Sequence, residues 1–159
     1  MAARRAGGPN RRGDGTGRDG RNRPACRFPK SAGGCIVGAM ATVGEVMSTS
    51  LHYVNPTTTV GEAVALMAQH RIGSTLVMEG TRLAGIFTER DTVRALSNSH
   101  DAPAHEVSSW MTPDPMTVSP EDSVDSALKT MLDHNFRHLP VMQGGEVVGI
   151  VSIRDLARA

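Results

Sequence analysis

The sequence predicts an α/β (α+β) fold in which two βαββα repeats pack as a pseudo-two-fold pair, preceded by a disordered tail. The first observation is an internal repeat: residues 46–91 align with residues 110–155 without a gap, and 14 of these 46 positions are identical. Chance supplies about three identities over such a length, so the chain contains a duplicated unit. Two copies are too few for a solenoid, and we therefore expect them to bury one shared face.

The second observation is a change of composition near residue 40, which predicts a disordered Arg/Gly-rich tail over 1–39 and repeats over 40–99 and 100–159. Residues 1–40 carry nine Lys or Arg and two Asp, whereas residues 41–159 carry eight basic and 14 acidic residues. The net charges of the two parts are therefore +7 and −6. The first 38 residues hold nine glycines and no apolar periodicity, so they bury too little surface to offset their ordering entropy.

Three other interpretations of the tail stay open. One is an RG-type nucleic-acid-binding segment, although Phe28 is the only aromatic residue among its arginines. Another is a mitochondrial transit peptide, although the glycines oppose an amphipathic helix. The third is an artefact of the gene start, because structured sequence begins at Met40. The acidic remainder has no electrostatic reason to bind nucleic acid, so we expect no nucleic-acid partner.

The cysteines and the apolar runs restrict the cellular compartment. Cys26 and Cys35 are the only cysteines and both lie in the tail, which excludes a disulfide scaffold for the rest of the chain. The longest apolar run near the start, residues 35–41, is far shorter than the ~20 residues that cross a bilayer. It is also too short for a typical secretory signal. We expect a cytoplasmic protein without membrane contact, with mitochondrial targeting as the alternative.

Each element of the first copy has a local signal. A short strand over residues 51–54 ends at a proline turn. Thr59 and Glu62 have the spacing of a capping box, and apolar residues then recur on one face up to residue 70, which predicts a helix. Two β-rich runs, 74–78 and 83–88, indicate a hairpin, and residues 89–96 predict a second helix.

The second copy repeats this order of elements. We expect a strand over residues 116–118, a helix over 123–134 and a hairpin over 139–151 around Gly144-Gly145. A short last helix then ends at Ala159.

The third observation is a motif at the last strand-to-helix junction of each copy, residues 85–91 and 149–155, in which a hydroxyl precedes a carboxylate by three residues. A helix start offers N–H groups to a phosphate, and the aspartate can accept bonds from both hydroxyls of a ribose. The leading glycine of each motif allows close backbone approach. The same spacing is an ordinary capping box, and the presence of two copies in register favours a nucleotide site.

Several linked motifs carry a resemblance to a known family. They are Val46-Met47-Ser48 with Trp110-Met111-Thr112, residues 60–67 with 124–131, Leu139-Pro140-Val141, and the two Gly-x-x-Thr/Ser-x-x-Asp segments. Together, over about residues 44–159, they make both repeats resemble cystathionine-β-synthase-type (CBS) domains. The resemblance implies a tandem pair packed through its sheets, with two clefts that often bind AMP, ADP, ATP, S-adenosylmethionine or NAD(H). Such pairs usually regulate and do not catalyse.

The resemblance also implies roles for particular residues. Asp91 and Asp155 would hold ribose hydroxyls, and Thr88 and Ser152 would hold phosphate. Val54 and Val118, with Thr57 beyond the first, would face the adenine.

Arg137 and His138 lie where the family often places basic phosphate ligands. The first copy departs from the pattern, since it has Gly73 and Ser74 at these positions and Leu76 in place of the family's proline. We therefore expect two unequal clefts.

Motifs for catalysis or metal binding are absent from the sequence. The six histidines show no His-Glu-x-x-His spacing, and we find no nucleophile elbow and no phosphate-binding Walker loop. We expect no enzyme activity, no metal and no required cofactor. The expected partners are an adenosyl ligand, a second copy of the chain in a homodimer, and a regulated protein that the sequence does not identify. The alternative is a protein–protein interaction module with vestigial clefts and no nucleotide binding.

Overall fold

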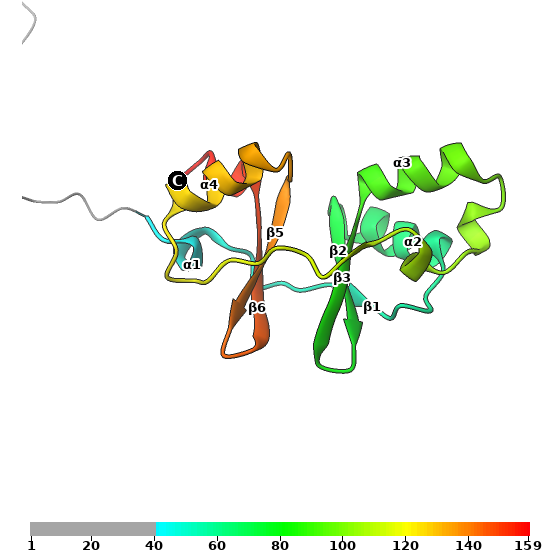
Figure 1. Cartoon of the computed structure of the whole chain (residues 1–159), viewed down its shortest axis with the longest axis horizontal. Helices are drawn as coiled ribbons and strands as arrows, with labels where there is room; N and C mark the ends of the chain where they lie inside the picture. Colours follow the sequence, from blue (N-terminus) through cyan, green and yellow to red (C-terminus); the bar gives the residue numbers. More distant parts are fainter. Residues whose placement is uncertain (1–40) are drawn as a thin grey trace, which may run out of the picture. The chain divides into compact units, whose positions relative to one another are not determined.

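A computed structural model describes residues 41–159, and the predicted tail over residues 1–39 lies outside them. The predicted α/β class with repeated units is confirmed, and Figure 1 shows the two repeats beside each other. The elements, in chain order, are α1 (Val43–Val46), β1 (Tyr53–Val54), α2 (Val60–His70), β2 (Ser74–Glu79), β3 (Arg82–Thr88), α3 (Glu89–Asn98), β4 (Thr112–Pro113), α4 (Val124–Asp133), β5 (His138–Gln143), β6 (Glu146–Ser152) and α5 (Ile153–Leu156).

The first repeat holds a four-stranded sheet in the order β1-β2-β3-β4. β2 and β3 form the predicted antiparallel hairpin, and Gly80 turns it with a φ of 63°, which glycine adopts at little cost. α2 begins at the predicted capping box, in which Glu62 Oε2 accepts from the Thr59 N–H at 2.9 Å. That backbone bond lowers the pKa of Glu62. The first strand is shorter than predicted, because only Tyr53 and Val54 pair with β2.

The second repeat lacks the strand that the sequence predicts over residues 116–118. Val118 makes only an isolated parallel bridge to Val141. The physical reason is Pro140, which aligns with Leu76 of the first repeat. The Leu76 N–H donates to the His52 carbonyl at 3.1 Å, whereas proline has no N–H to donate, so the matching ladder bond cannot form. β5 and β6 therefore make a two-stranded sheet.

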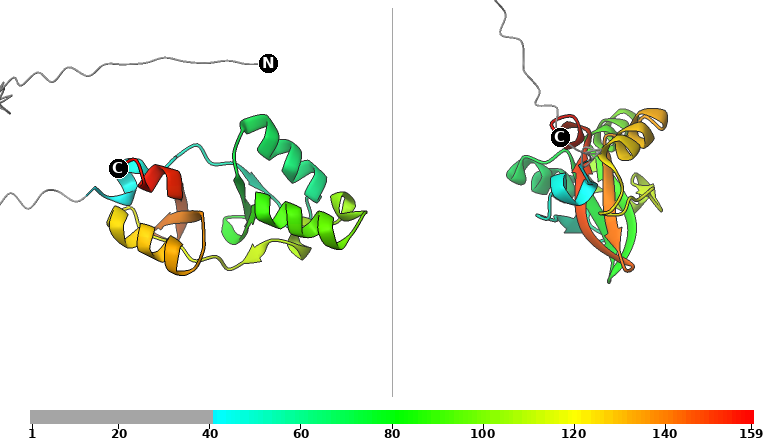
Figure 2. Two further views of the ribbon diagram at one scale, coloured as in Figure 1. Left: turned by 90° about the horizontal axis from the view of Figure 1, so that it is seen from above. Right: turned by 90° about the vertical axis from the view of Figure 1, so that its left-hand side faces the viewer.

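The opening segments of the two repeats are exchanged in space. α1 contacts α5 and β6, Ser48 bridges Ile150, and Val43 is buried in the core of the second repeat. Conversely, β4 pairs with β3, and Val107 is buried in the core of the first repeat. Figure 2 shows the start of the described chain beside the C-terminal helix. The boundaries 40–99 and 100–159 describe the repeats in the sequence and stay a prediction. In space, the opening segment of each repeat packs on the other repeat.

This exchange explains the glycine that leads each repeated motif. A Cβ built on Gly85 would lie 2.6 Å from Met111 Sδ, and one built on Gly149 would lie 2.4 Å from Met47 Sδ. The space that the sequence assigned to a ligand is therefore filled by the methionine of the exchanged segment. No helix within residues 41–159 has the length and apolar character needed to cross a membrane.

Candidate functional site

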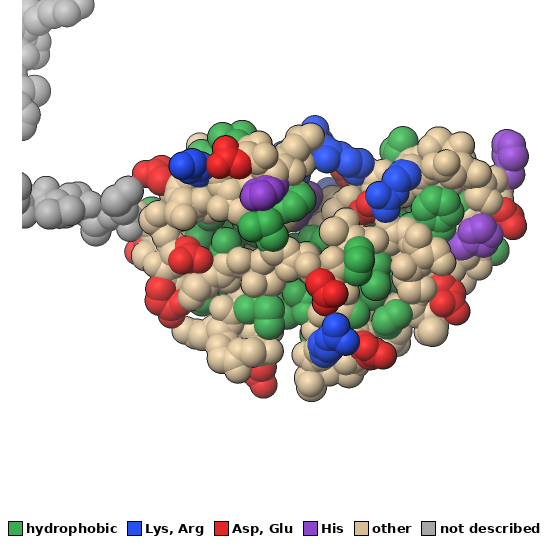
Figure 3. All heavy atoms as spheres, in the orientation of Figure 1, with side chains coloured by type: hydrophobic (Ala, Val, Ile, Leu, Met, Phe, Trp, Pro, Cys, Tyr) green, Lys and Arg blue, Asp and Glu red, His purple; other side chains and the backbone are tan. Residues whose placement is uncertain are grey.

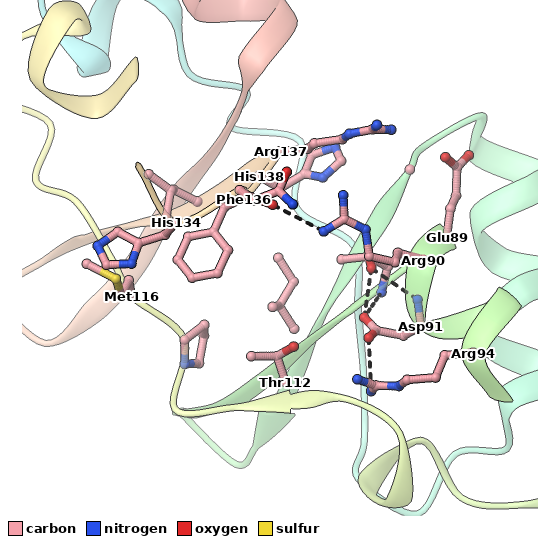
Figure 4. A pocket seen from close by; sticks show the side chains of 16 residues that line it. Glu89, Arg90, Asp91, Arg94, Thr112, Met116, His134, Phe136, Arg137 and His138 are labelled. Carbon is pink, nitrogen blue, oxygen red and sulfur yellow. Dashed lines mark hydrogen bonds and ion pairs between the residues drawn. The ribbon is translucent and has the colours of Figure 1, made fainter. Parts of the chain in front are cut away.

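Two of the clefts between the repeats in residues 41–159 contain the repeated motifs. The Asp91 cleft has a volume of about 300 Å³; it lies at the start of α3 and has residues 134–139 of the second repeat as its opposite wall (Figure 4). The Asp155 cleft has a volume of about 630 Å³; it lies at the start of α5 and faces residues 50–52 and 71–74 of the first repeat. Each cleft therefore combines the repeated motif of one repeat with the segment of the other repeat that leads into its hairpin, at the start of β5 or of β2.

Asp91 is held in a capping box at the start of α3. Its Oδ2 accepts from the Thr88 N–H at 2.9 Å and from the Thr88 hydroxyl at 2.7 Å, and its Oδ1 pairs with Arg94 Nη2 at 3.0 Å. The residue is only 5% exposed. A carboxylate offers about four acceptor positions, so one position on Oδ1 is left for a ligand.

Asp155 has the same box but fewer protein contacts. Its Oδ2 accepts from the Ser152 N–H at 2.9 Å and from the Ser152 hydroxyl at 2.6 Å. Within residues 41–159 its Oδ1 has no partner, so about two acceptor positions are left there. In both boxes the hydroxyl proton is directed at the aspartate. Thr88 and Ser152 would therefore have to rotate their hydroxyls to donate to a phosphate.

Arginine side chains surround both clefts. Figure 3 shows basic side chains around the hollow between the repeats. Arg90 and Arg94 line the Asp91 cleft, and Arg71, Arg154 and Arg158 line the Asp155 cleft. Arg137 lines both clefts. The Asp155 cleft thus has the larger number of cations.

Two of these arginines are already bonded to the protein. Arg90 Nη1 donates to the Asn135 carbonyl of the second repeat at 3.1 Å, and Arg94 pairs with Asp91 and also donates to the Trp110 carbonyl. Figure 4 shows the Arg90 bond to the second repeat and the ion pair between Arg94 and Asp91.

His138 lies beside Arg137, but it does not act as a second cation at neutral pH. Burial lowers the pKa of His138, and the nearby Arg137 and Arg154 act in the same direction, although the carboxylates of Glu89 and Asp155 oppose them. The predicted basic pair thus contributes one permanent charge.

No group of three or more His, Cys, Asp or Glu side chains in the described part of the chain is arranged to hold a metal ion.

The predicted adenine contacts lie outside both clefts. Val54 is buried in the core of the first repeat, Val118 packs against the core of the second, and Thr57 is exposed. None of the three is among the residues that line either cleft. Their role in adenine binding stays a prediction.

Each cleft is lined by a segment that the sequence motifs did not single out. The segment lies two or three residues before Val54 in one cleft and before Val118 in the other. Leu51-His52 line the Asp155 cleft, and Pro115-Met116 line the Asp91 cleft. The offset of 64 residues pairs these segments with each other, which is the signal that could have found them. Phe136, whose ring faces the Asp91 cleft in Figure 4, carried no repeated signal.

The comparison with known families agrees with this geometry. A model of the CBS domain matches residues 43–98 and again residues 106–159. The chain belongs to the CBS domain family. This CBS pair is 44% identical over 124 residues to an uncharacterised 17.7 kDa protein of Acidianus ambivalens, a match that covers 76% of this chain and 74% of that protein.

Two solved CBS structures that resemble this chain contain adenosine compounds. The structure of CBSX2 in complex with AMP has a TM-score of 0.66 and 27% identity, and the match covers 74% of this chain and 93% of that one. The CBS domain pair of protein MJ0100, in complex with 5′-methylthioadenosine and S-adenosyl-L-methionine, has a TM-score of 0.68 and 25% identity, with coverage of 74% and 97%. The predicted family resemblance is thus confirmed.

Proposed function

We propose that this CBS pair is a regulatory module that binds an adenosine-containing ligand in the Asp91 and Asp155 clefts and catalyses no reaction. One observation carries the proposal: each cleft places a carboxylate with open acceptor positions among arginines and apolar side chains. This set matches the three parts of a nucleotide, since carboxylates accept from ribose hydroxyls, arginines bind phosphate and apolar walls cover a base.

In the Asp91 cleft the base would lie against the apolar wall of Ile86, Met116 and Phe136. Asp91 can accept one ribose hydroxyl on Oδ1 without releasing Arg94. Arg137 would supply the charge for a phosphate.

In the Asp155 cleft, Leu51 and Ile72 supply apolar surface, and Oδ1 of Asp155 can accept both ribose hydroxyls. Three further arginines line this cleft, which favours a ligand with more phosphate charge than the Asp91 cleft would take. AMP in the related CBSX2 structure supports the ligand class.

The test is isothermal titration calorimetry with AMP, ATP, S-adenosylmethionine and adenosine. We expect at least one of them to bind, and we expect Asp155→Ala to weaken that binding about tenfold, the effect of losing a charge-assisted hydrogen bond of ~1.5 kcal/mol. Asp125→Ala, an exposed change on α4 outside both clefts, is the matched control. If none of these compounds bound, the interaction-module alternative would replace this proposal.

The sequence predicts a homodimer, and we propose from the structure that α3 forms its interface. Val93 and Leu96 on this helix are 67% and 51% exposed, an unusual pair of apolar side chains for a helix in contact with water. Sedimentation should give a dimer for the wild type and a monomer for Val93→Glu. A monomeric wild type would contradict the proposal.

The proposed location remains the cytoplasm.

A further inference from the structure

Four residues, Gly73, Glu89, Arg137 and His138, line both clefts and form a shared wall between them. The wall is tightly packed: a Cβ built on Gly73 would lie 3.3 Å from His138 Cε1 and 3.6 Å from Glu89 Cδ. Both clefts are therefore bounded by the same residues. A charged ligand in one cleft changes the electrostatic potential that a ligand in the other cleft meets.

Among the arginines of residues 41–159 that line the Asp91 cleft, two are bonded to other described residues and one is not. Arg90 donates to the Asn135 carbonyl and Arg94 is paired with Asp91. Arg137, by contrast, is exposed, and its guanidinium has no hydrogen bond or ion pair with any residue in 41–159. A phosphate in this cleft depends on Arg137, unless it breaks one of the other two contacts.

The Asp155 cleft has other cations besides Arg137. Arg71, Arg154 and Arg158 line it, and their side chains make no hydrogen bond or ion pair within the described residues. A polyphosphate carries several anionic oxygens, each of which an arginine can bind. It therefore has reason to bind here first and to draw in Arg137 as well.

The rest of the shared wall cannot replace Arg137 as a counter-charge. Burial keeps His138 neutral at pH 7, as its lowered pKa shows, and Glu89 adds a carboxylate to the wall. Two anionic ligands would therefore compete for one guanidinium.

From this shared wall, and resting on the proposed function, we propose that the two clefts compete for Arg137. Binding of a nucleoside polyphosphate in the Asp155 cleft then weakens anion binding in the Asp91 cleft and leaves it selective for an uncharged adenosine compound. By linkage the effect is reciprocal, and couplings of this kind typically change an affinity by about 5- to 150-fold.

The experiment compares ATP binding in the Asp91 cleft with the neighbouring cleft empty and filled. A triple variant, Asp155→Ala with Arg71→Ala and Arg158→Ala, removes the carboxylate and two arginines of the Asp155 cleft and reports the first affinity, and the second ATP step of the wild type reports the other. We expect the second step of the wild type to be at least about fivefold weaker than binding to this triple variant. Adenosine, which carries no phosphate, should enter the ATP-loaded wild type with its affinity unchanged.

Two variants of Arg137 identify the cause. Arg137→Ala should make ATP binding in the Asp91 cleft weak whether or not the other cleft is filled, so the coupling disappears. Arg137→Lys keeps the charge and should keep the coupling. Arg158→Ala, which removes a cation from the Asp155 cleft alone, should weaken the first ATP step and leave binding in the Asp91 cleft intact.

The outcomes separate this inference from the function beneath it. Equal ATP affinities for the Asp91 cleft with the neighbour empty and filled would overturn the competition while leaving the nucleotide site in place. A coupling that survives in Arg137→Ala would also overturn it. A wild type that binds AMP or S-adenosylmethionine but not ATP would overturn the competition alone. If none of AMP, ATP, S-adenosylmethionine and adenosine bound, the proposed function and the competition would both be wrong.

Discussion

Replacing Gly85 with alanine tests the exchange of opening segments directly. The new Cβ would lie 2.6 Å from Met111 Sδ and 2.8 Å from the Thr112 carbonyl oxygen. The sulfur can move because it is near the end of a flexible side chain. The carbonyl cannot move alone, because Thr112 is part of β4 and pairs with Ile86 of β3. The substitution therefore has to shift a strand.

The magnitude follows from two opposing terms. Forcing a methyl group into a packed site costs about 1–3 kcal/mol. Alanine also restricts the unfolded chain more than glycine does, which stabilises the fold by about 0.4–1 kcal/mol. We expect Gly85→Ala to lower the free energy of unfolding by about 1.3 kcal/mol, the difference between the mid-range values of these terms, about 2 and about 0.7 kcal/mol.

Gly149→Ala is the matched comparison within the same chain. Its Cβ would lie 2.4 Å from Met47 Sδ, but the nearest backbone atom, the Ser48 oxygen, is 3.2 Å away. A methionine that changes rotamer relieves most of this clash. We expect a cost below about 1 kcal/mol for this variant, because the overpacking is relieved mainly by a side chain.

Urea denaturation of the full chain, followed by circular dichroism, measures both variants. Gly85→Ala should also weaken binding in the Asp91 cleft, since Thr112 lines it, and leave the Asp155 cleft intact. A Gly85→Ala protein as stable as the wild type, or less affected than Gly149→Ala, would refute the argument that β4 packs against this glycine.

Two further predictions concern the titratable groups of the clefts. Asp91→Asn should destabilise the fold by about 1–2 kcal/mol in urea denaturation, and Asp155→Asn should destabilise it by less. The reason is that Asp91 loses an ion pair to Arg94 in addition to its charged cap bonds. Equal losses of stability in the two variants would contradict the role of that ion pair. The pKa of His138 is lowered in the folded state, so the unfolded chain binds the proton more tightly and stability should fall as the pH drops below about 6.5, the ordinary value for histidine. Melting temperatures between pH 7.5 and 5.5 should fall less steeply for His138→Gln than for the wild type, and parallel curves would show that His138 is not responsible.

The sequence by itself determined the features that depend on short-range spacing. The capping box at Thr59 and Glu62, the hairpin over residues 74–88 and the helix after Ser123 are all present as predicted, because each is made by residues a few positions apart. The duplication was equally readable, since it is a property of the sequence alone. The absence of a strand over 116–118 follows from Pro140. The sequence contains this proline, but it does not show which segment would pair with it.

Only the tertiary structure decided which distant segments meet. Met111 fills the space beside Gly85, Arg137 lines both clefts, and Asp91 shares its cleft with residues 134–139 of the other repeat. These contacts join residues from different elements, and no periodic pattern along the chain records them. They arise because each repeat buries its apolar face only when the other supplies its opening segment, so the site is assembled by packing between repeats and not by either motif alone.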